Sequence, residues 1–217
     1  MTPPPLVPTW TELLPLLRDA AETGRFHHHV SMNAGKLAWM RSDPEGDAIV
    51  RRAHSRAADG VMAQVGTGAA RVPGVELAAR LLEEAAVRGW RVALVGARAE
   101  GVAEVGRLWT ARGVRIVHLE DGYDPDEGAV IARIRAAEPQ LVLAALGSPR
   151  AERFLDRAHF DALGLGVGGS FDVWAGAVPR APAWACALGL EGVVRVAREP
   201  RKRLGPFLRS VAALVRP

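Results

Sequence analysis

The segment Gly166–Asp172 gathers three glycines and one carboxylate after a short apolar run, a pattern suited to holding a ligand. Glycines let a ligand approach the backbone closely, and the oxygens of Asp172 could accept hydrogen bonds from ribose hydroxyls or from the edge of a base. The alternative is a bend that needs positive φ angles, with Asp172 as a helix cap. We favour the ligand interpretation, because the glycines and the polar side chain converge where a predicted strand ends.

Asp59 is a second candidate for chemistry. It precedes Gly60 after a mildly apolar segment, and a carboxylate in a dry pocket can remove the proton of a hydroxyl group. Asp-Gly is also a common turn dipeptide. On pattern alone, a turn is therefore the favoured interpretation of Asp59.

Three other chemical patterns fail on spacing or residue type. In a strand only His27 and His29 would share a face, and no cysteine or acidic ligand is near them in sequence, so we expect no metal. Gly96–Gly101 lacks both G-x-G-x-x-G and Gly-Lys-Ser/Thr, which argues against NAD binding and ATP hydrolysis. That loop fits either a phosphate at a helix N-terminus or a tight turn. Cys186 has no patterned partner for nucleophilic catalysis.

Short apolar runs alternate with helical patterns, which is typical of an α/β fold with a Rossmann-like, mostly parallel sheet flanked by helices. The expected strands cover residues 27–31, 58–65, 91–95, 115–119, 141–146 and 163–167. The expected helices cover about residues 9–23, a stretch from 36, and 75–88, 102–111, 126–137 and 152–159. Pro15 should kink or shorten the first helix, and Asp43-Pro44 predicts a turn with Asp47 as the next cap. Ligands bind at the carboxyl ends of parallel strands, so the candidate site should lie in the loops there.

The positive charge is concentrated at the end of the chain. Residues 191–217 hold seven basic and two acidic groups, a net of +5, whereas residues 1–190 carry a net of −1. From Pro206 onward the apolar residues fall on one helical face, opposite Arg209 and Arg216. We therefore divide the chain into a core domain, 1–190, and a basic amphipathic appendage, 191–217. The appendage fits either a helix docked on the core or attachment to anionic lipid or a diphosphate.

Composition excludes several classes of protein. The 217 residues are 49% hydrophobic and 24% charged, which are globular values. One cysteine excludes an internal disulfide framework and fits a reducing compartment. We find no apolar run of about 18 residues and no signal-peptide pattern, so we expect neither a membrane span nor secretion. A near-neutral core without interleaved aromatic and basic residues argues against nucleic-acid binding.

An ordered set of short segments resembles the WecG/TagA/CpsF family of bacterial glycosyltransferases, over nearly the whole chain. The matching segments are Ser31–Asn33, Asp59-Gly60, Arg71–Gly74, Asp121–Tyr123, Gly147–Glu152, Gly166–Asp172, Ala175-Gly176, Arg180–Pro182, Gly189–Glu191, Arg195 and Glu199–Arg201. The resemblance implies a Rossmann-like core and a hexosyltransferase that inverts the anomeric centre without a metal or another cofactor. It implies transfer of an N-acetylmannosamine-type or related sugar from a UDP-sugar to a sugar on a polyprenyl diphosphate. The products belong to polymers such as teichoic acid, so a peripheral position at the cytoplasmic face of an anionic membrane is expected; oligomerisation stays open.

The resemblance also assigns roles, and it reverses the interpretation of Asp59, which becomes the general base. Substrate-binding roles fall on Ser31, Asn33, Gly60, Arg71, Tyr123, Gly147, Pro149, Glu152, Gly168, Gly169, Asp172 and Arg180. Among these, Ser31 and Asn33 would line the sugar pocket, and Gly168, Gly169 and Asp172 would hold the uridine end with Tyr123 nearby. The acceptor diphosphate and the membrane would be met by Arg195, Arg198, Arg201 and Arg203.

The chain departs from the family pattern at three positions. Ala151 stands where a glutamine is usual, Gly192 where a tryptophan is usual, and Ser31 where a threonine is usual. Ser31 keeps the hydroxyl group, but the other two changes remove an amide and an aromatic surface. The alternative function is therefore a non-catalytic relative that binds a UDP-sugar without transferring it.

Overall fold

The computed structural model of the protein describes residues 4–60, 64, 67–179, 181, 182, 185, 194, 196, 197 and 205. The predicted domain boundary at residue 190, Cys186 and nearly all of the basic appendage lie outside this part of the chain.

Six parallel strands form one sheet, in the order β2-β1-β6-β5-β3-β4. The strands are β1 (His27–Met32), β2 (Ser55–Ala58), β3 (Arg91–Gly96), β4 (Arg115–Glu120), β5 (Leu141–Ala145) and β6 (Leu163–Gly166). The fold is thus the predicted α/β, Rossmann-like arrangement. All carboxyl ends lie at one edge of the sheet, with β1, β2 and β6 as neighbours.

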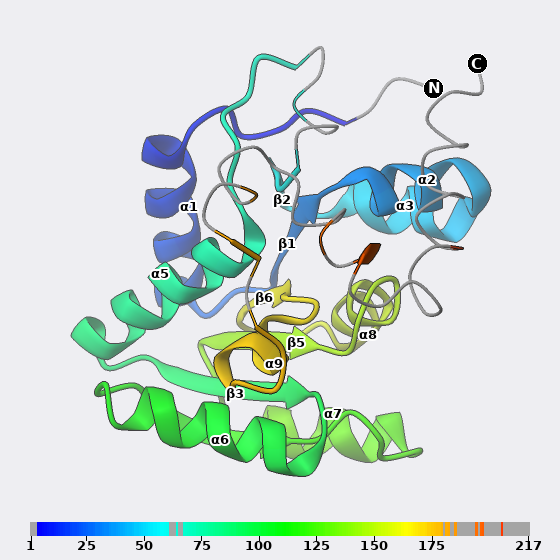
Figure 1. The fold of residues 1–217 in the computed structure, drawn as a ribbon. Coiled ribbons are helices and arrows are strands. Elements are labelled where there is room, and N and C mark those ends of the chain that lie inside the picture. The colour runs from blue at the N-terminus through cyan, green and yellow to red at the C-terminus, as the bar shows by residue number, and fades with distance from the viewer. Residues whose placement is uncertain are drawn as a thin grey trace.

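Helices cover both faces of the sheet (Figure 1). One face packs against α1 (Trp10–Thr23), α5 (Gly74–Arg88), α6 (Ala99–Thr110) and α9 (Ser170–Trp174). The other packs against α2 (Ala34–Ser42), α3 (Pro44–Arg52), α7 (Glu127–Ala136) and α8 (Arg150–Ala158). The central strands are apolar on both faces because they are buried on both, which explains their continuous runs of Val, Leu and Ala.

Local signals set both ends of α1 and the end of α5 as predicted. The Thr9 hydroxyl accepts a hydrogen bond from the Glu12 N–H and begins α1, which ends at Gly24 with a φ of 61°. Pro15 lies inside this helix without shortening it, contrary to one of the two expected effects. Gly89, with a φ of 68°, ends α5 in the same left-handed conformation as Gly24.

Two local predictions were wrong. The helix α3 begins at Pro44 with Asp43 as its cap, so Asp47 lies within the helix rather than before it. The second strand is Ser55–Ala58, and the strand predicted at residues 58–65 does not form at Asp59, Gly60 and Gln64, which are the residues described after Ala58 in that range. Its Arg56 is accommodated because the guanidinium donates to the carbonyls of Val50, Arg51 and Ala53. Strand β2 therefore forms because it pairs with β1, and the hydrophobicity of its sequence alone does not predict it.

Candidate functional site

Asp59 lies directly after β2 and is held from two sides. Its backbone N–H donates to the carbonyl of Met32 at 2.7 Å, which aligns it with the end of β1. Its Oδ1 accepts a hydrogen bond from the N–H of Gly74 at 2.8 Å. Gly74 is the first residue of α5, and Pro73 at the N-cap provides no side-chain hydrogen bond. The half-buried Asp59 carboxylate is therefore oriented by a helix N-terminus, which also stabilises its negative charge.

Gly74 brings Ser31 close to Asp59. A Cβ atom at Gly74 would lie 3.3 Å from the Ser31 Oγ and 3.7 Å from the Asp59 Oδ2. The two polar side chains therefore flank the same point at the start of α5. The absence of a side chain at Gly74 allows this close approach.

A row of hydrogen-bonding side chains leads along β1 to Ser31. The Ser55 hydroxyl on β2 lies 2.8 Å from the His27 Nε2 and 2.9 Å from the His29 Nδ1. The His29 Nε2 lies 3.5 Å from the Ser31 Oγ. Complete burial lowers the pKa of His29 well below its ordinary value, so this ring is neutral. His27 and His29 thus share a face as expected and contact a serine there.

Asn33 and Gly60 complete the polar group at the ends of β1 and β2. The Asn33 Oδ1 accepts a hydrogen bond from the Lys36 N–H at 3.1 Å and caps α2. This contact fixes which amide atom faces the helix, so the Nδ2 group remains as the donor. A Cβ at Gly60 would lie 3.9 Å from the Asn33 Cβ, which places the two residues side by side. The fold therefore brings together four predicted site residues: Ser31, Asn33, Asp59 and Gly60.

Glu152 is buried in the first turn of α8 and is paired with Lys36. The Lys36 Nζ lies 2.8 Å from the Glu152 Oε1 and donates to the Ser31 carbonyl, also at 2.8 Å. Burial acts to raise the pKa of Glu152, but the charge and hydrogen bond of Lys36, together with hydrogen bonds from Ser148 and the backbone, outweigh it and hold the pKa below its ordinary value. Sequence reasoning missed Lys36. The available signal was a lone lysine among the small and apolar residues of Ala34–Met40.

The glycines that follow β5 and β6 shape the backbone of the loops at the ends of these strands. Gly168 and Gly147 have φ angles of 55° and 75°, as the bend interpretation requires. Gly169 precedes α9, and the exposed Asp172 lies in the first turn of that helix without capping it. The alternative interpretation of Asp172 as a helix cap is therefore wrong, and its exposed carboxylate can contact a ligand.

Gly166 lies beside Glu152 for a steric reason. A Cβ there would come within 2.9 Å of the Glu152 Oε1 and 3.1 Å of the Ala151 Cβ. Glycine therefore allows α8 to pack closely on β6. Ala151 is fully buried in the same contact.

Tyr123 is not close to Asp59. It follows β4, which is separated from β2 by four strands in the sheet, so the strand spacing alone places these ends about 24 Å apart. The Tyr123 side chain is 71% exposed. Its loop is connected to the start of α8, because Arg150 donates to the Gly122 carbonyl at 2.7 Å. Pro149 immediately precedes that helix.

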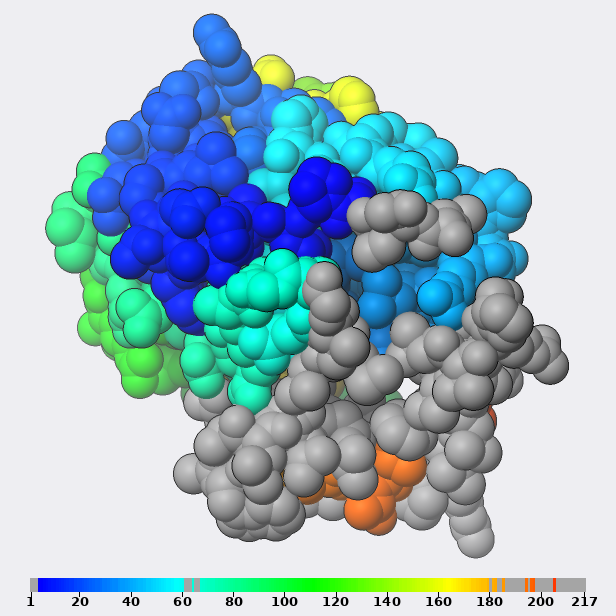
Figure 2. Space-filling model, turned by 90° about the horizontal axis from the view of Figure 1, so that it is seen from above, coloured from blue at the N-terminus to red at the C-terminus, as the bar shows by residue number. Residues whose placement is uncertain are grey.

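Arg71 is half-buried and pairs with Ala58 in a parallel bridge just before Asp59. Its carbonyl accepts a hydrogen bond from the Trp10 Nε1. Figure 2 shows the N-terminal segment and α1 beside the segment leading into α5. The other predicted cations lie outside the described residues: Arg180, Arg195, Arg198, Arg201 and Arg203.

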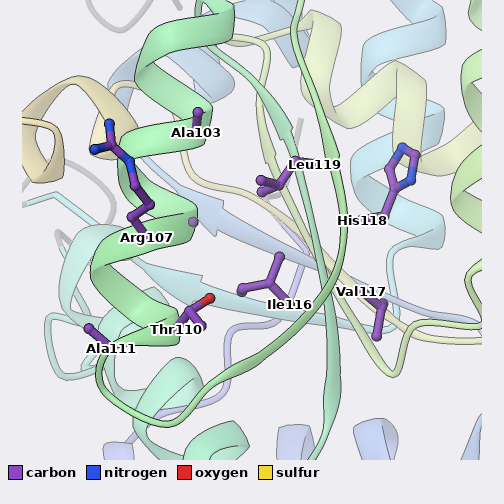
Figure 3. A pocket seen from close by; sticks show the side chains of 9 residues that line it. Ala103, Arg107, Thr110, Ala111, Ile116, Val117, His118 and Leu119 are labelled. Atoms are coloured by element: carbon purple, nitrogen blue, oxygen red, sulfur yellow. The ribbon is translucent and has the colours of Figure 1, made fainter.

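Two hollows among the described residues are separate from this group. One, of about 400 Å³, lies at the amino ends of the strands, around Arg91 and Gln140. The other, of about 810 Å³, is an open groove between α6 and β4. Figure 3 shows Ile116 and Leu119 on the side of β4 that faces α6. A bulge at Val117 permits this, because Val92 pairs with Ile116 and Ala93 pairs with His118. Neither hollow is lined by a predicted site residue.

The described part of the chain has neither a cluster of metal-ligating side chains nor a membrane-spanning helix. No three His, Cys, Asp or Glu side chains gather there in a way that could hold a metal ion. No helix there has the length and apolar character needed to cross a membrane.

The α/β fold with its parallel sheet agrees with one family comparison. The model of the glycosyl transferase WecG/TagA/CpsF family matches residues 6–216, which is nearly the whole chain. The protein therefore belongs to the WecG/TagA/CpsF family of glycosyltransferases, which act in cell-surface polysaccharide synthesis on a sugar donor and a lipid-linked acceptor.

Proposed function

We propose that the protein is an inverting, metal-independent hexosyltransferase. It transfers an N-acetylmannosamine-type or related sugar from a UDP-sugar to a sugar on a polyprenyl diphosphate. The observation that carries the proposal is the Asp59 carboxylate, held by the Gly74 N–H at the carboxyl edge of the sheet. This is the edge where α/β proteins bind their ligands.

Asp59 acts as the general base. The acceptor hydroxyl oxygen attacks the anomeric carbon on the face opposite UDP, and Asp59 takes its proton as the new glycosidic bond forms. The bond between the anomeric carbon and the UDP oxygen breaks, and UDP leaves with the electron pair. One displacement on one face inverts the anomeric configuration. A positioned base contributes about 10²–10⁴-fold to such a step.

Ser31 and Asn33 orient the sugar beside this base. The Asn33 Oδ1 is occupied by the cap of α2, so the Nδ2 group can donate to a hydroxyl or acetamido oxygen. Ser31 contributes a hydroxyl group next to Gly74, and Gly60 keeps the neighbouring loop close to Asn33. These contacts supply hydrogen bonds in the orientation that the displacement needs.

The nucleotide and diphosphate bind along the same edge. Gly168 and Gly169 offer backbone contacts to the uridine, and Asp172 accepts hydrogen bonds from it. Gly147, Pro149 and Tyr123 form the neighbouring loops, and Glu152 braces them from α8. Negative charge develops on the diphosphate of the departing UDP. It is stabilised by Arg71, Arg180 and the arginines at 195, 198, 201 and 203, because cations and backbone donors stabilise developing negative charge.

The test is UDP release from a panel of UDP-sugars, with and without a polyprenyl-diphosphate-linked sugar. We expect release that depends on the acceptor and a product of inverted anomeric configuration. Retained configuration in the product would contradict the displacement. Tight UDP binding with no transfer to any acceptor would instead support the alternative of a non-catalytic relative.

A further inference from the structure

Lys36 occupies an unusual place for a lysine. It lies in the first turn of α2 and is only 4% exposed. Its ammonium contacts two different parts of the fold, the Ser31 carbonyl and the Glu152 carboxylate, each at 2.8 Å. The residue has no part in the proposed chemistry.

The two contacts join strand β1, which carries part of the candidate site, to helix α8. Ser31 lies near the end of β1, and the Met32 carbonyl that follows it accepts the Asp59 N–H. Glu152 lies on α8, packed against Gly166 at the end of β6. Lys36 therefore connects the segment Ser31–Asn33, at the end of β1, to the helix that follows β5.

A buried ion pair at this position is not explained by stability alone. Removing two charges from water costs several kcal/mol per ion, and replacing such a pair by uncharged groups of similar volume is often neutral for stability. The pair instead fixes geometry, because an ammonium with two short contacts holds both partners in one arrangement.

We propose that Lys36 is a positioning residue that holds the Ser31–Asn33 segment against Glu152 and thereby orients Ser31 and Asn33 toward the donor sugar. The effect of this positioning on catalysis rests on the proposed function. The positioning itself can be measured without any substrate.

The test uses the double variant Lys36→Met/Glu152→Gln. It removes both charges, whereas Lys36→Met alone would leave Glu152 buried and unpaired and endanger folding. The matched control is Arg52→Met/Asp156→Asn, which removes a different ion pair between α8 and a neighbouring helix. Neither residue of the control pair has a role in the candidate site.

The first measurement is amide hydrogen exchange. The Lys36 N–H bonds to Asn33 and the Asp59 N–H bonds to Met32, so both amides report on the positioned segment. We expect both to exchange about 10-fold faster in the double variant, while the core amide of Leu143 and the control variant match the wild type. Unchanged exchange of the backbone amides at positions 36 and 59 would overturn the proposal, whether or not the protein transfers a sugar.

The second measurement is kcat/KM for the donor at several pH values. We expect a loss of at least about 10-fold with the shape of the pH profile unchanged, because Asp59 remains. Wild-type kcat/KM in a variant with faster amide exchange would overturn the role of Lys36 in orienting the sugar. If the wild-type protein transfers no sugar, the proposed function is refuted. Faster amide exchange in the double variant would then still support the positioning by Lys36.

Discussion

Asp59 is held by a helix that begins 15 residues later in the chain. The hydrogen bond from the Gly74 N–H fixes the carboxylate, and the same glycine admits the Ser31 hydroxyl. The geometry of the proposed base therefore depends on a residue that has no side chain.

Substitution of Gly74 by alanine tests this dependence. A Cβ 3.3 Å from the Ser31 Oγ is a tight contact that displaces the Ser31 hydroxyl by a few tenths of an ångström, whereas its distance of 3.7 Å to the Asp59 Oδ2 is an ordinary contact. We expect kcat to fall by about 10-fold, since a misplacement of about 1 Å can cost about 100-fold in catalysis and this displacement is smaller. The free energy of unfolding should change by only about 1 kcal/mol, because alanine favours helix.

The control for this substitution is Gly101→Ala in α6, where the new Cβ would lie 3.6 Å from the Ala97 Cβ. It should keep both kcat and thermal stability. Equal activity of Gly74→Ala and Gly101→Ala would show that the approach of Ser31 to Asp59 is not needed.

At the scale of elements, the packing of α8 on β6 places Glu152. Gly166→Ala would put a Cβ within 2.9 Å of the Glu152 Oε1 and 3.1 Å of the Ala151 Cβ. Overpacking of this kind costs about 1–3 kcal/mol, so chemical denaturation should show a loss of that size. Gly128→Ala in α7, with only an ordinary contact of 3.4 Å, should show no such loss. Equal stability of the two variants would mean that α8 moves to accommodate the new Cβ at position 166 without a cost in stability.

Strand β1 makes the stability of the protein depend on pH. Burial lowers the pKa of His27 and of His28 to about 4, and it lowers the pKa of His29 well below the ordinary 6.5. The unfolded chain takes up protons as the pH falls through 6.5, while the native rings of His27 and His28 stay neutral to about pH 4. Unfolding therefore becomes more favourable as the pH falls through this window.

The variant His28→Leu measures one part of this effect. Both ring nitrogens of His28 are buried without a hydrogen-bond partner among the described residues, so leucine should be tolerated. We expect the decrease in Tm between pH 6.5 and pH 4.5 to be smaller in the variant than in the wild type. An identical decrease in the two proteins would exclude His28 as a source of the pH dependence.

At the scale of the whole molecule, the net charge is unevenly distributed along the chain. The net charge of +5 in residues 191–217 contrasts with −1 in the remainder. We propose that this segment brings the enzyme to an anionic membrane surface, where each basic residue contributes about 1 kcal/mol.

Liposome co-sedimentation tests this proposal. The full chain should bind vesicles containing an anionic lipid and lose binding as salt is raised, because the attraction is screened. The triple variant Arg201→Glu/Lys202→Glu/Arg203→Glu should bind several-fold more weakly. Equal binding of this variant, or equal binding to neutral vesicles, would contradict a role for the basic residues.

The periodicity of the sequence predicted most of the fold, because strands buried on both faces give continuous apolar runs. It did not predict β2, since Ser55–Ala58 is selected by pairing with β1 and by the carbonyl partners of Arg56. The resemblance predicted site roles for Ser31, Asn33, Asp59 and Gly60, and the structure places these residues together at the ends of β1 and β2, while their roles stay predictions. The Asp59–Gly74 and Lys36–Glu152 contacts join segments distant in sequence, and no local pattern indicates such contacts.

The most direct test of the account is the rate of acceptor-dependent UDP release by Asp59→Asn. The amide oxygen can still accept the Gly74 N–H, so the fold is kept and only the base is lost. The control is Asp126→Asn, which changes a capping carboxylate at the start of α7. We predict that kcat falls by about 10²–10⁴-fold in Asp59→Asn, with UDP affinity and Tm unchanged, and stays at the wild-type value in Asp126→Asn. A kcat for Asp59→Asn within a few-fold of the wild type would contradict the assignment of Asp59 as the base.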